Sequence, residues 1–141
     1  MSDARPVRLW TMLVKVRGLR VERKRRALHE ARLAAQRAAA DTVRQRTAIR
    51  QHEVRRTEIL AACLSANVAA PLWRAALQRH DTQRFTLEEA VRRALRAERL
   101  AQSQVADASR AFQRETVAEE DARARLRRLQ AEQHWSDDPE D

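Results

Sequence analysis

The stretch LEEAVRRALRAERLAQSQVADASRAFQRETVAEEDARARLRRL, residues 87–129, decides the fold class. Positions spaced alternately four and three residues apart form one stripe along it, and ten of the thirteen positions are apolar. A stripe sustained over about six heptads predicts a coiled-coil helix. The stripe consists of Leu87, Val91, Ala94, Glu98, Ala101, Val105, Ala108, Phe112, Glu115, Glu119, Ala122, Leu126 and Leu129.

The sequence also predicts where this helix begins and ends. Thr86 followed by Glu89 matches a capping box, and Phe85 stands just before it as a hydrophobic staple. The end is expected near His134, before the run SDDPED. We therefore predict a helix over about 86–134, followed by an acidic tail at 135–141.

A second, looser stripe precedes it. Nine of its fifteen positions are apolar: Val14, Val21, Leu28, Ala31, Ala35, Ala38, Ile49, Ile59 and Cys63. Positions 17, 24, 42, 45, 52 and 56 are polar, which indicates imperfect pairing or a partner elsewhere. Gly18 is the only glycine and costs a helix about 1 kcal/mol. The stripe predicts a helix over about 9–68.

The segment between the stripes contains Pro71, which suits the first turn of a short helix. We predict a connector helix over about 69–85. A lone amphipathic helix must cover its stripe, so the two long helices are expected to pair. The predicted fold is all-α: a long antiparallel two-helix coiled-coil hairpin with a short connector helix, forming a single coiled-coil domain over 1–141.

Composition agrees with this fold class. The 141 residues include one Gly, three Pro and no Tyr, too few turn-formers for a sheet protein. The net charge of +9 is uneven: residues 1–60 hold 16 basic and 6 acidic side chains, and residues 86–141 hold 10 and 13. The two halves are thus complementary. A single cysteine, Cys63, and the lack of a long apolar run favour a cytoplasmic location.

Sequence motifs for catalysis are not found. One glycine cannot build a phosphate-binding loop. The four histidines, His29, His52, His80 and His134, have no His or Cys at metal-ligand spacing. Cys63 has no histidine on a neighbouring turn to act as a base. We expect no enzyme activity, no cofactor and no metal site.

The run LVKVRGLRVERKRRAL, residues 13–28, holds two Lys and five Arg. Three interpretations stay open: a solvated helix face, a nucleic-acid contact, or a surface that docks on an acidic protein. A leucine-zipper DNA reader would use residues such as Asn, yet the only asparagine, Asn67, lies far from the run. The acidic second half would also repel phosphate.

Residues 8–31, RLWTMLVKVRGLRVERKRRALHEA, resemble the N-terminal signature of the FliJ/YscO family of flagellar and type III secretion stalk proteins. The resemblance rests on Leu13, Val14 and Lys15, then Arg17, Leu19 and Arg20, and an Ala-rich basic helix through Ala27 and Leu28. Val21 stands where the family often has Glu; the acid here is Glu22.

This resemblance implies a non-enzymatic stalk that joins a hexameric export ATPase to the membrane export gate. Some members also contact secretion chaperones. It places the protein in the cytoplasm at the inner-membrane base of the apparatus, reaching the membrane only through partners. No specific nucleic acid is implied, and a homo-oligomer stays open. The alternatives are a basic coiled-coil nucleic-acid-binding protein and a self-assembling scaffold.

Two sets of site residues follow. Arg17, Arg20 and Lys24 share one helix edge, and Arg23 widens the charge; they are the expected ATPase contact. Trp73 and Leu77 are four residues apart and share a face. They either cover the end of the hairpin core or, with Phe85, contact the export gate.

Overall fold

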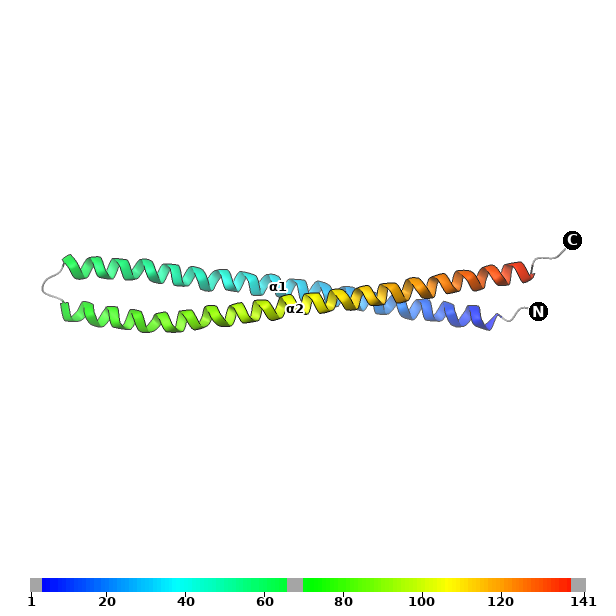
Figure 1. Ribbon diagram of the computed structural model, residues 1–141, viewed down its shortest axis with the longest axis horizontal. Coiled ribbons are helices and arrows are strands. Elements are labelled where there is room, and N and C mark those ends of the chain that lie inside the picture. Colours follow the sequence, from blue (N-terminus) through cyan, green and yellow to red (C-terminus); the bar gives the residue numbers. More distant parts are fainter. Residues whose placement is uncertain (1–3, 66–69, 138–141) are drawn as a thin grey trace. The chain divides into compact units, whose positions relative to one another are not determined.

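The chain folds into two antiparallel helices. The computed structural model describes residues 4–65 and 70–137. α1 spans Arg5–Ser65 and α2 spans Ala70–Asp137 (Figure 1). Every element in these ranges is helical, and no backbone φ in them is positive. The predicted all-α antiparallel coiled-coil hairpin is confirmed.

The prediction of a separate connector helix was wrong, because α2 begins at Ala70 and continues through Thr86. Pro71 does occupy the first turn, as expected. No glycine or proline follows before the second stripe, so nothing interrupts the helix. The Thr86 and Glu89 pair is therefore not a capping box but lies in the interior of α2, and Glu89 instead pairs with Arg92 at 2.9 Å.

The outer ends also differ from the prediction. α1 begins at Arg5 rather than near residue 9. Residues 135–137, assigned to the acidic tail, form the end of α2, which closes at Asp137. The predicted residues 66–68 of the first helix, residue 69 of the connector and residues 138–141 of the tail lie outside the described residues.

Contacts divide the chain into two units. The first unit combines residues 1–32 with residues 104–141, and the second contains residues 33–103. Each unit therefore consists of one part of α1 packed on one part of α2. The two units are described separately below.

Both predicted stripes face the partner helix. All thirteen positions of the stripe from Leu87 to Leu129 are buried or half-buried, and so are all positions of the α1 stripe except the exposed Lys24. Alternating steps of three and four residues keep a row on one face of a helix, which is why the sequence pattern identified the covered face of each helix.

The core between the helices is thin. Its buried apolar residues are Val21, Leu28 and Ala122 in the first unit, and Ala94 and Ala101 in the second. No large side chain among the described residues is fully buried. Two helices enclose only one row of contacts, which we call the seam. Most seam residues therefore stay partly exposed. None of the described helices is apolar enough over a sufficient length to cross a bilayer.

Gly18 lies within α1 with ordinary helical geometry. A Cβ atom built on it would meet Glu119 Oε1 at 3.8 Å, an ordinary van der Waals distance. We expect Gly18→Ala to raise the free energy of unfolding by about 1 kcal/mol, because alanine removes the glycine penalty without a clash. Chemical denaturation followed by circular dichroism measures this. A loss of stability would mean that the helices approach more closely here than the structure describes.

Thr86→Ala tests the corrected start of α2. Replacing a threonine at an N-cap with alanine lowers the stability of the protein by about 1 kcal/mol. Replacing an exposed threonine inside a helix does not lower the stability, since alanine has the higher helix propensity. We expect the variant to be as stable as the wild type or slightly more stable in the same denaturation assay. A loss of stability near 1 kcal/mol would show that Thr86 is an N-cap after all.

Candidate functional site

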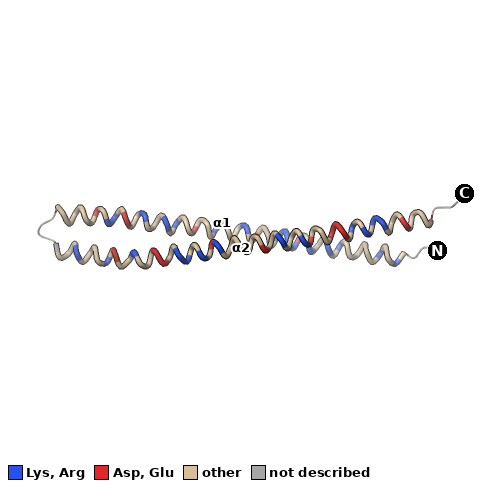
Figure 2. The backbone as a smooth tube through the Cα atoms, viewed as in Figure 1, with Lys and Arg blue, Asp and Glu red and all other residues tan. Residues whose placement is uncertain are grey.

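The first candidate surface is a basic concave face on the first unit. Arg20, Arg23 and Lys24 are exposed on α1 and line this surface together. Its lining is completed by Arg26, Ala27, Glu30 and Glu115. Figure 2 shows the basic residues of this part of α1 in blue, and both signs of charge along α2. The structure thus brings three of the four predicted ATPase-contact residues onto one surface.

Arg17, the fourth predicted residue, makes a contact within the protein. Its Nη1 lies 3.8 Å from Glu115 Oε2 on α2, and its side chain is less than one-third exposed. That distance is an ion pair but too long for a hydrogen bond, and Glu115 Oε2 is buried with no hydrogen-bond partner among the described residues. Arg17 therefore offsets the charge of a buried carboxylate in the seam.

The second predicted site is divided between seam and surface. Trp73 and Leu77 are half-buried, whereas Phe85 is 75% exposed. Leu77 and Phe85 line one shallow groove; its other lining residues are Arg74, Gln78, Asp81 and Thr82. Trp73 is not part of that lining. Leu77 and Phe85 thus offer a small apolar surface beside charged groups.

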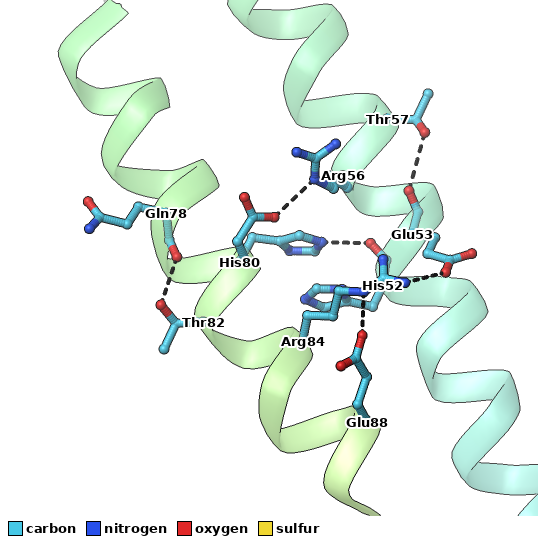
Figure 3. A network of polar contacts seen from close by, with 10 residues as sticks. His52, Glu53, Arg56, Thr57, Gln78, His80, Thr82, Arg84 and Glu88 are labelled. Atoms are coloured by element: carbon cyan, nitrogen blue, oxygen red, sulfur yellow. Dashed lines mark hydrogen bonds and ion pairs between the residues drawn. The ribbon is translucent and has the colours of Figure 1, made fainter. Parts of the chain in front are cut away.

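A histidine pair in the second unit was missed by the sequence analysis. His52 on α1 and His80 on α2 are both buried, and their rings stack with centroids 3.4 Å apart and planes 7° apart (Figure 3). His80 Nε2 lies 2.6 Å from the backbone oxygen of His52. Because a carbonyl only accepts, Nε2 of His80 must carry the proton and donate.

The sequence did contain a signal for this pair. Extending the second stripe backward in the same three- and four-residue steps gives Arg84, His80, Leu77 and Trp73. Each of these residues is buried or half-buried. The assumed helix start at Thr86 stopped the stripe at Leu87, so His80 was never placed opposite the polar stripe position His52.

Ion pairs between the helices surround the histidines (Figure 3). Arg56 Nε donates to Asp81 Oδ1 at 2.9 Å, and Arg84 Nη2 donates to Glu53 Oε1 at 3.1 Å. Arg84 Nε also donates to Glu88 Oε1 on its own helix, at 2.8 Å. These pairs are part-exposed, so they fix geometry more than they add stability.

Two of these groups have shifted pKa values. The hydrogen bond from Arg56 lowers the pKa of Asp81, helped by the positive charge of Arg56 and opposed by desolvation. The hydrogen bond to Glu88 raises the pKa of Arg84, and Glu53 adds to the effect. Both shifts favour the charged forms that hold the helices together.

The described residues contain no group of three or more His, Cys, Asp or Glu that could hold a metal ion. Cys63 is free and half-buried. The described surfaces include the basic concave face and the shallow groove lined by Leu77 and Phe85. Comparison with known proteins gives no family model, no curated protein and no solved structure that matches this chain.

The Asp81–Arg56 pair predicts a pH effect on stability. Because folding lowers the pKa of Asp81 below its ordinary value of 3.8, the pair stabilises the fold above that value. This contribution is lost as the pH falls through the lower pKa of the folded state. We expect Asp81→Asn to lose less stability than the wild type between about pH 5 and pH 2. Urea denaturation at each pH measures the difference.

Arg56→Gln and the double variant complete a thermodynamic cycle for this prediction. We expect both to show the same shallower acid profile as Asp81→Asn, because each lacks the same hydrogen bond. Parallel acid profiles for all four proteins would show that the pair does not couple to folding.

Proposed function

We propose that this protein is a non-enzymatic central stalk of a bacterial type III protein secretion apparatus. In this role it couples a hexameric export ATPase to the membrane export gate. It works in the cytoplasm at the inner-membrane base of the apparatus, and secretion chaperones are further candidate partners. The resemblance of residues 8–31 to the FliJ/YscO signature and the two-helix hairpin support the proposal.

The observation that carries the proposal is the basic concave surface on the first unit. This unit presents Arg20, Arg23 and Lys24 without an ion-pair partner among the described residues. Exposed cations on a helical support suit contacts that form and break against an acidic protein surface. We assign this surface to the ATPase.

The same surface favours a protein partner over nucleic acid. Glu30 and Glu115 belong to its lining, and Glu119, Glu120 and Asp121 follow on α2 in the same unit. A phosphate backbone is a continuous anion and would be repelled by these carboxylates. A folded protein can place separate acidic groups opposite Arg20, Arg23 and Lys24 and avoid the carboxylates.

In this proposal the second partner contact, the one with the export gate, is made by the second unit. Phe85 is the most accessible of the residues assigned to it, and Leu77 extends the same groove. Trp73 and Leu77 also lie on the seam, so they support the hairpin and its surface together. An aromatic residue that enters a partner pocket is a common interface anchor.

Neutralising the basic surface tests the ATPase contact. We expect the triple change Arg20→Gln, Arg23→Gln and Lys24→Gln to weaken ATPase binding at least tenfold, because it removes the charges that meet the acidic partner. Arg17 is kept because it pairs with Glu115. Binding of the wild type should also weaken with salt, since exposed pairs are screened over ~8 Å at physiological ionic strength. Isothermal titration with the purified ATPase measures both effects.

The matched control removes three exposed arginines from the second unit, Arg37→Gln, Arg46→Gln and Arg99→Gln, and should bind the ATPase like the wild type. Salt dependence alone does not separate a protein partner from nucleic acid. Duplex DNA is therefore titrated against the protein alone and against the protein–ATPase mixture. Tight DNA binding at physiological salt with no ATPase binding would refute the stalk proposal.

A further inference from the structure

The N-terminal part of α1 carries a second apolar row, and its side chains are exposed. Leu9, Met12, Val16 and Leu19 are 66%, 65%, 42% and 64% exposed. They follow one another in steps of three, four and three residues, so they form one row on the helix, which we call the outer row. At 3.6 residues per turn, the outer row lies on roughly the opposite side of α1 from the seam residues Val14 and Val21.

The flanks of the outer row are basic. In heptad terms the row occupies the a and d positions, and Arg8, Lys15 and Arg20 occupy flanking g and e positions. All three are exposed, and none has an ion-pair partner among the described residues. The sequence has no Asp or Glu between Arg5 and Val21, so no carboxylate in this segment offsets their charge.

The width of the outer row indicates what covers it. A helix that lies on a lipid surface carries a large apolar face opposite a strongly polar one. A row limited to the a and d positions is the narrower pattern of a seam with another helix. The exposed apolar residues of this segment occupy only a and d positions, because Leu13, at the neighbouring e position, is half-buried. The outer row is therefore better matched to a helix than to a membrane.

The charges disfavour a second copy of this chain as the partner. In a parallel pair Lys15 of one copy would face Arg20 of the other, and in an antiparallel pair Arg8 would face Lys15. Both arrangements bring like charges together along the row. A helix with acidic residues at its own flanking positions meets no such repulsion.

We propose that the outer row is a docking site for an acidic amphipathic helix of another protein. That helix packs an apolar row with three- and four-residue spacing on Leu9, Met12, Val16 and Leu19. Its flanking Asp or Glu side chains pair with Arg8, Lys15 and Arg20. Docking adds a third helix to this end of the hairpin. The inference does not depend on the stalk proposal, because it rests on exposure, spacing and charge alone.

A designed peptide tests the site on the full-length protein. The probe is a fluorescently labelled four-heptad helix with Leu at its a and d positions and Glu at its e and g positions. The controls are a scrambled peptide of the same composition and a second peptide with Lys in place of the flanking Glu. We expect the acidic peptide to bind by fluorescence anisotropy and both control peptides to bind at least tenfold more weakly.

Variants locate the binding. Leu9→Gln, Met12→Gln and Leu19→Gln together should weaken the acidic peptide at least tenfold while the circular dichroism spectrum is kept, because these side chains are exposed. The matched control changes three exposed apolar residues of the second unit, Val43→Gln, Val54→Gln and Leu60→Gln, and should bind like the wild type. Arg8→Glu, Lys15→Glu and Arg20→Glu together should reverse the preference toward the Lys-flanked peptide.

Three results would overturn the proposal. The first is equal binding of the acidic and scrambled peptides. The second is binding of the wild type, but not of the outer-row variant, to phosphatidylserine vesicles while the peptide does not bind, which assigns the row to a membrane. The third is a dimer in sedimentation equilibrium that only the outer-row variant loses, which assigns the row to a second copy.

Discussion

The structure depends on one constraint: each of two long helices has only the other to cover its apolar stripe. A pair of helices encloses a single row of contacts, so no seam residue can be surrounded on all sides. This explains why the buried apolar residues are few and mostly small, namely Val21, Leu28, Ala94, Ala101 and Ala122. It also explains how charged residues enter the stripe. Arg17 and Glu115 occupy seam positions as an interhelix ion pair; both side chains are less than one-third exposed, and Glu115 Oε2 is buried.

Polar contacts make this seam specific. Apolar rows of similar side chains could slide by one heptad with little change in buried area. The stacked His52 and His80 rings and the hydrogen bond from His80 to the His52 carbonyl form only when these two residues lie opposite each other. A slip would leave His80 buried without its acceptor, and an unpaired buried polar group is costly. The ion pairs Arg56–Asp81 and Arg84–Glu53, at the edges of the seam, favour the same register. The hydrogen bond from His80 therefore favours the register that the apolar stripe alone leaves weakly defined, whereas both ring nitrogens of His52 are buried without a partner among the described residues.

Predictions from the periodicity of apolar residues were correct, and the prediction from a local motif, the capping box at Thr86 and Glu89, was wrong. The two stripes placed the seam correctly because burial follows the spacing of three and four residues. The connector helix was wrong because Thr86 and Glu89 fit a capping box, yet the same residue types are tolerated inside a helix when the turn before them has no breaker. That error also hid His80. The outer row was missed for a different reason: Leu9, Met12, Val16 and Leu19 repeat with the same spacing as the seam, and the pattern cannot say which of two rows faces α2.

Two surfaces of the first unit share the same charges. Arg20 lines the basic concave surface and also flanks the outer row, and Arg23 lines the concave surface while following Leu19 along the line of the row. A carboxylate that pairs with Arg20 from one side removes the attraction for a carboxylate on the other side. If both proposals hold, partners at the two surfaces would be coupled through Arg20 and Arg23, even where their apolar contacts do not overlap. α2 adds only Glu115 to the lining of the concave surface, and Glu115 pairs with Arg17. The packing that builds the hairpin therefore leaves Arg20 and Arg23 without an ion-pair partner among the described residues.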